Sequence, residues 1–167
     1  MLLLNGEQKE VQLDALVWDA LYQIHDPEIP AISIVDLGIV NEVSVQETTV
    51  FVSLTPTFMG CPATQLIRKN VENELYKIIG VSNVSVKFVY DPPWTSDRIS
   101  EKGRQNLHKF GISPPKCQLH KLKTFTATCP FCESENTVLE NMFGPTACRS
   151  MFYCRSCHQP FEAMKPV

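Results

Sequence analysis

The sequence predicts an α+β domain, with a small mixed sheet and helices on one face, followed by a small β module that is clipped by a metal ion. Three observations support this prediction. Helical and strand-like patterns alternate over about the first 90 residues, two CxxC pairs separated by 21 residues lie near the C-terminus, and a proline-containing segment lies between these regions. We therefore expect a domain over residues 1–112, a linker over 113–125 and the metal-binding module over 126–167.

The first domain begins with a predicted amphipathic helix. Apolar residues recur at helical spacing from about Glu7 to Ile24, as they do on a helix with one buried face. The sequence D-P-E-I-P (26–30) ends this helix, because a residue before proline disfavours the α region. Two runs rich in β-branched residues follow, over 39–46 and 49–55, and the gap between them is so short that we expect a hairpin.

A second helix is predicted over about 61–79, because Pro62 suits the first turn of a helix and Gly80 suits its end. A strand over 81–90 then completes the order helix, strand, strand, helix, strand, which is typical of helices packed on one face of a small sheet. The last predicted element of this domain is a helix capped by Ser96 or Asp97 that ends near Phe110 and Gly111.

Composition and charge narrow the cellular context and the function classes. The apolar run Met1 to Leu4 stops at Asn5, so we expect neither a signal peptide nor a membrane span, and we predict a cytoplasmic protein with reduced cysteines. The net charge is -5 before Pro115 and +2 after it. Neither half is basic enough to predict a nucleic-acid-binding protein.

Four cysteines form the metal-binding pattern: Cys129 and Cys132 in C-P-F-C, and Cys154 and Cys157 in C-R-S-C. Two such turns on facing hairpins present four thiolates tetrahedrally to one ion, which is the plan of a zinc ribbon. Strands are expected over 136–143, over 147–153 and near Phe161. We favour zinc, with iron as the alternative ion, and a dithiol redox pair would need a thioredoxin-like context that this region lacks.

Three further positions of the module, Glu133, His158 and Cys148, need separate interpretation. Glu133 and His158 stand where many ribbons carry glycine after the second cysteine, and a closed four-sulfur site leaves His158 a surface or supporting position. Cys148 is about 20 Å of extended strand away from Cys154, too far to share its ion. Cys148 is therefore expected to be a buried apolar thiol, with a partner contact or a second metal as alternatives, and Cys117 in the linker is expected to be incidental.

The first domain contains one cysteine, Cys61, between Gly60 and Pro62. A thiol at the predicted helix start would be stabilised as a thiolate by unpaired backbone N–H groups and by the helix dipole, which favours nucleophilicity or metal affinity. A purely structural cysteine is the alternative. Asp26 and Glu28 lie in a proline-stiffened loop, and either they end the helix and cap a turn, or they supply an oxygen ligand or a proton acceptor beside Cys61.

Several motifs carry a family resemblance. D-P-E-I-P (26–30), S-I-V-D-L-G-I-V (33–40) and T-P-T-x-x-G-C-P (55–62) resemble the small domain of cytosolic iron-sulfur assembly proteins. P-P-W-T-S-D-R-I-S (92–100), F-G-I-x-P-P (110–115) and G-P-T-A-C-R-S (144–150), together with the four cysteines, extend the resemblance over nearly the whole chain. The full pattern is similar to the D-subunit family of bacterial phenylacetyl-CoA epoxidase systems.

The resemblance implies a reactive role for Cys61, handling metal or sulfur transiently, with Asp26 and Glu28 in support, and metal ligation by Cys129, Cys132, Cys154 and Cys157. In those systems a di-iron oxygenase epoxidises the aromatic ring and an iron-sulfur flavin reductase supplies electrons. This chain has neither a Glu-x-x-His di-iron pair nor a glycine-rich nucleotide loop. It therefore resembles an accessory component without catalytic activity of its own.

The leading hypothesis is an accessory protein that assists the assembly or maintenance of an iron-sulfur or iron centre during aerobic phenylacetate catabolism. Its expected partners are the reductase or the oxygenase, its expected cofactor is one structural zinc ion, and iron or an iron-sulfur cluster would be bound transiently. A homodimer is also compatible with the sequence. The alternatives are a rubredoxin-like electron carrier, a zinc-ribbon nucleic-acid-binding module and a thiol transferase at Cys61.

Overall fold

The computed structural model describes residues 6–116 and 125–167, except for the side chains of residues 6–11. The chain divides into two compact units. Unit 1 contains Met1–Pro56 and Pro62–Pro93, and unit 2 contains Thr57–Cys61 and Trp94–Val167. Cys117 lies outside the described residues, so its expected incidental role stays a prediction. None of the helices in the described part of the chain has the length and apolar character needed to cross a bilayer.

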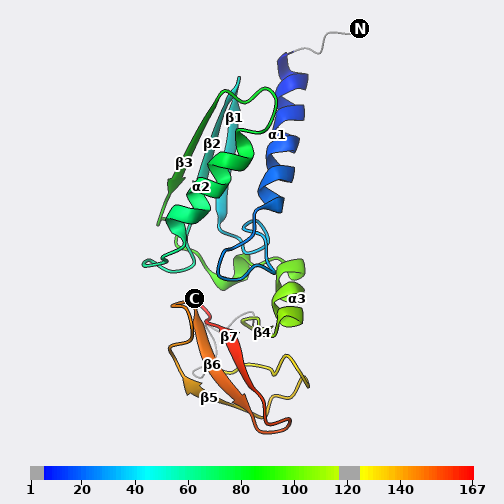
Figure 1. Cartoon of the computed structure of the whole chain (residues 1–167), viewed down its shortest axis with the longest axis vertical. Helices are drawn as coiled ribbons and strands as arrows, with labels where there is room; N and C mark the ends of the chain where they lie inside the picture. The colour runs from blue at the N-terminus through cyan, green and yellow to red at the C-terminus, as the bar shows by residue number, and fades with distance from the viewer. Residues whose placement is uncertain (1–5, 117–124) are drawn as a thin grey trace. The chain divides into compact units, whose positions relative to one another are not determined.

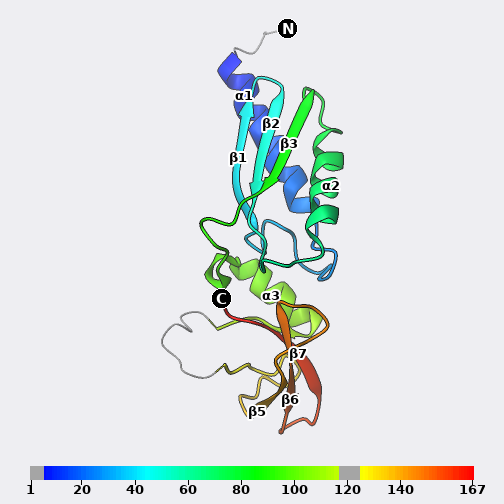
Figure 2. The same ribbon diagram turned by 90° about the vertical axis from the view of Figure 1, so that its left-hand side faces the viewer.

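Unit 1 is a three-stranded sheet with two helices on one face (Figures 1 and 2). Its elements are α1 (Gly6–Gln23), β1 (Val40–Gln46), β2 (Thr49–Leu54), α2 (Thr64–Leu75) and β3 (Asn83–Phe88). The strand order is β1-β2-β3; β1 runs antiparallel to β2, whereas β3 runs parallel to it. The predicted fold class, a mixed sheet with helices on one face, is confirmed for this unit.

The core of unit 1 lies between the helices and the sheet. Val17 and Leu21 of α1, Val50 and Leu54 of β2, and Val71 of α2 are all fully buried. Burying side chains of this size stabilises the fold by about 1.5–3 kcal/mol each. Because β2 and β3 are parallel and joined through α2, their carboxyl ends lie at the same edge of the sheet. In the sequence, the segment that contains Cys61 follows β2.

Unit 2 contains a four-stranded sheet preceded by a short helix. Its elements are η1 (Ser96–Arg98), α3 (Glu101–Phe110), β4 (Ile112–Ser113), β5 (Thr137–Asn141), β6 (Arg149–Cys154) and β7 (Pro160–Met164). The strand order is β4-β7-β6-β5, and β4 is parallel to β7 while the other pairs are antiparallel. The three strands predicted for the ribbon correspond to β5, β6 and β7.

Two expectations about α3 differ from the structure. Its N-cap is Ser100, whose hydroxyl accepts a hydrogen bond from the Gly103 N–H, and not Ser96 or Asp97, which form the 3₁₀ turn η1. The helix ends where predicted, at Gly111, whose φ of 92° closes it. The division into units falls before α3, whereas the sequence placed the domain boundary after it, because β4 follows α3 directly and pairs with β7.

Candidate metal centre and the reactive-cysteine segment

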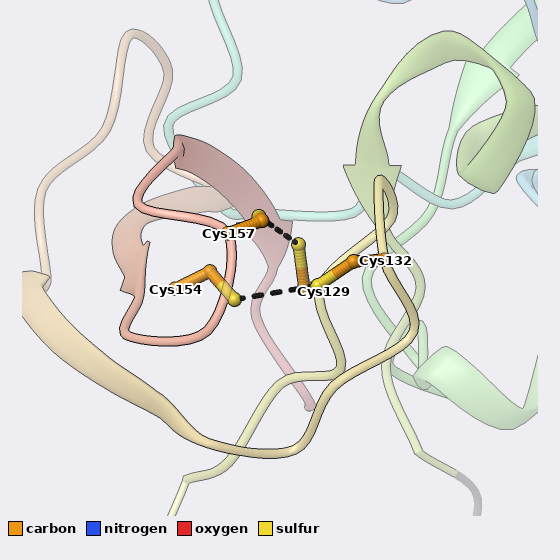
Figure 3. A group of neighbouring side chains, drawn as sticks. All are labelled: Cys129, Cys132, Cys154 and Cys157. Atoms are coloured by element: carbon orange, nitrogen blue, oxygen red, sulfur yellow. Dashed lines mark hydrogen bonds between the residues drawn. The ribbon is translucent and has the colours of Figure 1, made fainter.

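The four cysteines of the two CxxC pairs converge in unit 2 (Figure 3). The sulfur atoms of Cys129 and Cys157 are 3.6 Å apart, as are those of Cys132 and Cys154, and all four lie within 4.8 Å of one another. A tetrahedron with metal–sulfur bonds of about 2.3 Å has sulfur–sulfur edges of about 3.8 Å. The distances are too long for disulfides. The four thiols therefore fit one metal ion.

Each pair sits on a turn with the same backbone geometry. The N–H of Glu133 donates to the carbonyl oxygen of Cys129 at 2.9 Å, and the N–H of His158 donates to that of Cys154 at 2.9 Å. Glu133 and His158 both have positive φ, 58° and 61°. Ordinary side chains rarely adopt this left-handed region. The residue after each second cysteine is therefore under a backbone constraint.

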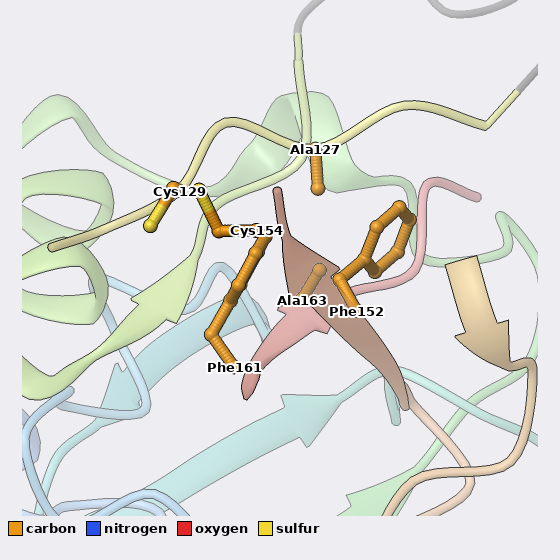
Figure 4. Packing of buried hydrophobic residues seen from close by; sticks show 6 residues of the cluster. All are labelled: Ala127, Cys129, Phe152, Cys154, Phe161 and Ala163. Atoms are coloured by element: carbon orange, nitrogen blue, oxygen red, sulfur yellow. The ribbon is translucent and has the colours of Figure 1, made fainter. Parts of the chain in front are cut away.

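One cysteine of each metal-binding pair lies in the core of unit 2 (Figure 4). Cys129 and Cys154 are fully buried in one cluster with Ala127, Phe152, Phe161 and Ala163. The ring of Phe152 stacks on Phe161, with centroids 5.7 Å apart, and meets Phe125 edge-on at 5.1 Å. Because the cluster is small, an ion bound to its sulfurs contributes folding free energy that so few side chains cannot supply.

In the metal-free chain, Cys154 and Cys157 differ in how readily their thiols lose a proton. The backbone N–H groups of Cys157 and Ser156 lower the pKa of Cys154 to about 6, although burial acts in the opposite direction. Burial raises the pKa of Cys157 to about 12, and the neighbouring sulfur of Cys132 adds to this increase. One thiolate is thus favoured before any metal binds. A bound cation deprotonates the remaining thiols outright.

The residues next to the four-sulfur group have other surroundings. His158 is exposed, and its Nδ1 lies 3.3 Å from the Tyr153 hydroxyl. Cys148 is half-buried, lies just before β6 and does not belong to the four-cysteine group. Its sulfur is 3.2 Å from the Thr146 hydroxyl. Cys148 is therefore less buried than the expected core thiol.

Two basic residues of the second half of the chain, Arg149 and Lys116, form ion pairs. Arg149 is buried, and its guanidinium contacts Glu162 at 2.5 Å and donates to the Thr146 hydroxyl at 2.8 Å. Lys116 contacts Glu135 at 2.5 Å and lowers the pKa of that carboxyl. Lys121 and Lys123 lie outside the described residues. The paired cations do not form an exposed basic stripe of the kind that binds nucleic acid.

The D-P-E-I-P segment of unit 1 is a tight, internally bonded turn. Asp26 is buried, with 7% of its surface exposed, and its Oδ1 accepts hydrogen bonds from the N–H groups of Glu28 and Ile29, both at 2.9 Å. Turn capping, one of the two interpretations of this segment, is thus how Asp26 is used here. Glu28 is half-buried on the same turn.

The motif S-I-V-D-L-G-I-V (33–40) of unit 1 is joined to the end of β2 by a backbone hydrogen bond. Ser33 donates to Asp36, and the N–H of Thr55 donates to the carbonyl oxygen of Ile39 at 2.7 Å. The Thr55 side chain is 1% exposed, and its hydroxyl has no hydrogen-bond partner among the described residues. An orphan buried hydroxyl costs about 1–3 kcal/mol. Sequence reasoning did not single out Thr55, since only the burial of a polar residue reveals it.

Cys61 lies outside the helix that it was expected to begin. Helix α2 begins at Thr64, with Ala63 as its N-cap, and the N–H of Cys61 donates to the carbonyl oxygen of Phe58 at 3.1 Å. The expectation of a thiol in the first turn of the helix is therefore wrong. The influence of a helix dipole falls off within that turn. Cys61 is half-buried and belongs to unit 2, whereas Asp26 and Glu28 belong to unit 1.

Comparison with known proteins matches the two parts of the chain to two different family models. A family model described as "Iron-sulfur cluster assembly protein" matches residues 14–87, and one described as "PaaD zinc beta ribbon domain" matches residues 113–165. The putative D subunit of the 1,2-phenylacetyl-CoA epoxidase of Escherichia coli is 38% identical over 154 residues, which span 90% of this chain and 92% of that protein.

Two further relatives match the first part of the chain. The Fe-S protein maturation auxiliary factor YitW of Bacillus subtilis is 36% identical over 92 residues, which span 54% of this chain and 89% of that protein. The crystal structure of a DUF59 domain from Bacillus anthracis matches with a TM-score of 0.56 and 26% identity, covering 60% of this chain and 96% of that domain. This region is thus similar in sequence to an iron-sulfur maturation factor and in fold to a DUF59 domain.

Proposed function

Since the chain belongs to the family of the 1,2-phenylacetyl-CoA epoxidase D subunit, we propose that it is a non-catalytic accessory protein of a phenylacetyl-CoA ring epoxidase system. Its role in this proposal is to assist the assembly or maintenance of an iron-sulfur or iron centre in a partner protein. The partner is the iron-sulfur flavin reductase or the di-iron oxygenase of the same system, and the site of action is the cytoplasm.

One observation carries the proposal. A domain that matches iron-sulfur assembly proteins and a ribbon that matches the PaaD type occur in one chain, and the E. coli D-subunit relative matches across both. An assembly domain alone would favour a general maturation factor such as YitW. The added ribbon favours a maturation factor dedicated to one multicomponent enzyme.

In this proposal Cys61 is the residue that handles the cargo. A thiolate is a soft ligand that suits iron and iron-sulfur clusters. Cys61 is half-buried and is held on a turn whose N–H–carbonyl bond joins it to Phe58. A transient carrier must release what it binds, and one protein thiolate is a weaker anchor than a closed four-sulfur site.

The acidic turn of unit 1 has the supporting role. Asp26 holds the turn through two N–H groups, so we assign Glu28 the oxygen ligand or proton acceptor and Asp26 the positioning of Glu28. The Thr55 hydroxyl, orphaned among the described residues, adds a polar group at the end of β2. This supporting role requires Glu28 to lie close to Cys61.

The ribbon serves as a docking module in this account. Cys129, Cys132, Cys154 and Cys157 would hold one zinc ion, and a closed four-sulfur zinc site supplies folding free energy and no catalysis. The surrounding side chains exclude water from Cys129 and Cys154 and fix their orientation.

A pull-down from cells grown on phenylacetate tests the partnership. The tagged wild-type chain should capture the reductase or the oxygenase, and a Cys129→Ser/Cys154→Ser double variant, which loses the ion, should capture neither. The variant Lys77→Gln alters an exposed ion pair of unit 1 and serves as the matched control. Equal capture by the double variant would contradict the docking role, and capture of neither protein by the wild type would contradict the partnership.

A further inference from the structure

Unit 2 contains an open cavity of about 160 Å³ that lies apart from the four-cysteine group. Aromatic side chains of Phe58, Trp94 and Phe125 line it, together with the sulfur-containing side chains of Met142 and Cys148. Among the described residues of its lining, Lys165 has the only charged side chain. The cavity is thus apolar and aromatic, with one cation.

The volume limits what the cavity can hold. An apolar cavity of about 150 Å³ binds benzene, so a volume of about 160 Å³ is large enough for one six-membered ring. An aromatic ring would meet aromatic edges and faces as well as the Met142 thioether, both of which attract aromatic rings.

The wall of the cavity at Cys148 is connected to a partly buried ion pair. The Thr146 hydroxyl lies 3.2 Å from the Cys148 sulfur and accepts from Arg149 Nε at 2.8 Å, and Arg149 in turn pairs with Glu162 at 2.5 Å. Arg149 is 7% exposed. A wall fixed in this way loses little entropy when a ligand binds.

The position of Lys165 gives the cavity a preference for charge. Its ammonium donates to the carbonyl oxygen of Ala147 at 2.8 Å and lies 5.2 Å from the centre of the Phe143 ring. An ammonium has three N–H donors, so one carbonyl acceptor leaves it the capacity to bind a carboxylate. A hydrogen bond of this kind, between two charged groups, is stronger than one between neutral groups.

We propose that this cavity binds a small monocyclic aromatic carboxylate, with the ring among Phe58, Trp94 and Phe125 and the carboxylate on Lys165. The proposal goes beyond the accessory function and does not depend on it, because neither Cys61 chemistry nor a partner protein is needed for binding. Phe58 lies three residues before Cys61, so a bound ring would contact the segment that carries this thiol.

Trp94 provides the measurement. The chain has two tryptophans, and Trp18 lies in unit 1, so in a Trp18→Phe background the emission reports on Trp94 alone. Phenylacetate added to the zinc-loaded full chain should change this emission saturably at millimolar concentration or below. Phenylacetamide, which has the same ring without the charge, should bind about tenfold more weakly, and acetate should have no effect.

Variants locate the binding site. Cys148→Phe fills the cavity and should abolish the response, whereas Cys148→Ser keeps its size and should retain it. Lys165→Gln should weaken phenylacetate to the level of phenylacetamide, and Lys109→Gln, on the exposed side of α3, should leave binding unchanged. Zinc content and far-UV circular dichroism verify that each variant is folded. As an independent measurement, phenylacetate should slow the alkylation of Cys148 by iodoacetamide.

Two results would overturn the proposal. One is the absence of a saturable response in the folded, zinc-loaded chain at millimolar phenylacetate, with no protection of Cys148. The other is undiminished binding by a folded Cys148→Phe variant, since the ligand would then bind elsewhere. Equal affinity for phenylacetate and phenylacetamide would refute the assignment of the carboxylate to Lys165.

Discussion

Glu133 and His158 occupy equivalent positions, one residue after the second cysteine of each metal-binding pair, and both have a left-handed backbone conformation with φ of 58° and 61°. From the sequence, they were recognised only as positions where many ribbons carry glycine. The structure instead relates them to backbone strain, because an L-residue in this region costs about 1–2 kcal/mol.

We expect Glu133→Gly to stabilise the zinc-loaded chain by up to about 1 kcal/mol, since glycine relieves the strain but adds entropy to the unfolded chain. His158→Gly should gain less, because it also removes the contact between the imidazole and the Tyr153 hydroxyl. Denaturant unfolding measures both changes. Glu133→Ala is the control and should give no gain; destabilisation by Glu133→Gly would contradict the strain argument.

Removal of the metal should unfold the ribbon and leave unit 1 folded. The cluster around Phe152 and Phe161 contains few side chains, whereas the core of unit 1 contains no group that depends on a metal among the described residues. With a strong chelator, amide hydrogen exchange should become fast in β5, β6 and β7 and stay slow in α1 and β2. Continued protection of β6 in the chelated chain would show that the ion is dispensable. Elemental analysis of the untreated chain decides between zinc and iron.

Acid should remove the metal only at a low pH. The pKa of Cys154 is lowered from 9.0 to about 6 in the metal-free chain, so the stabilisation from its thiolate is fully present above the ordinary thiol pKa and is lost as the pH falls through about 6. Metal binding acts in the same direction. A zinc indicator should therefore report no release above pH 7 and half-release below about pH 6. Half-release above pH 7 would show that the raised pKa of Cys157, and not the lowered pKa of Cys154, governs release.

Alanine substitutions at Gly144 and at Gly60 form a matched pair of tests. A Cβ at Gly144 would lie 2.9 Å from the backbone carbon and oxygen of Arg149, whereas a Cβ at Gly60 would meet only the Phe58 ring, at 3.9 Å. Gly144→Ala should therefore destabilise the chain by about 1–3 kcal/mol, and Gly60→Ala should leave stability nearly unchanged. Thermal unfolding measures both. Equal effects of the two substitutions would show that the close approach at Gly144 is not the cause.

Much of the fold could be predicted because it depends on local patterns. The apolar period of α1, the β-branched runs of β1 and β2, and the spacing of Cys129, Cys132, Cys154 and Cys157 each determine an element or a site within a short stretch of sequence. The mixed sheet followed from the order of these elements, since β2 and β3 are separated by a helix.

The remainder depends on contacts between residues distant in sequence. β4 contains only two residues, Ile112 and Ser113, and is defined by its pairing with β7 about 50 residues later. No local pattern predicts such a pairing, so the sequence grouped α3 with the strands of the first domain. The start of α2 was misplaced because Pro62 suits the first turn of a helix as well as the turn just before it.

The candidate site, like the fold, depends partly on contacts that no local sequence pattern predicts. Asp26 was correctly singled out as a turn-capping candidate, because aspartate before proline is a local signal, but the burial of Thr55 and the unequal pKa values of the cysteines arise only from packing. The aromatic cavity beside Cys148 combines residues from 57 to 167. A sequence pattern cannot specify such a set.

In the function proposed above, Cys61 handles iron or sulfur for a partner of the epoxidase system. The most direct test is the iron and acid-labile sulfide content of the reductase and the oxygenase, purified from phenylacetate-grown cells that carry Cys61→Ser or, as a control, Cys148→Ser. The account predicts a severalfold lower content in at least one of the two proteins with Cys61→Ser and a normal content with Cys148→Ser. Normal iron and sulfide in both proteins with a stably expressed Cys61→Ser variant would contradict it.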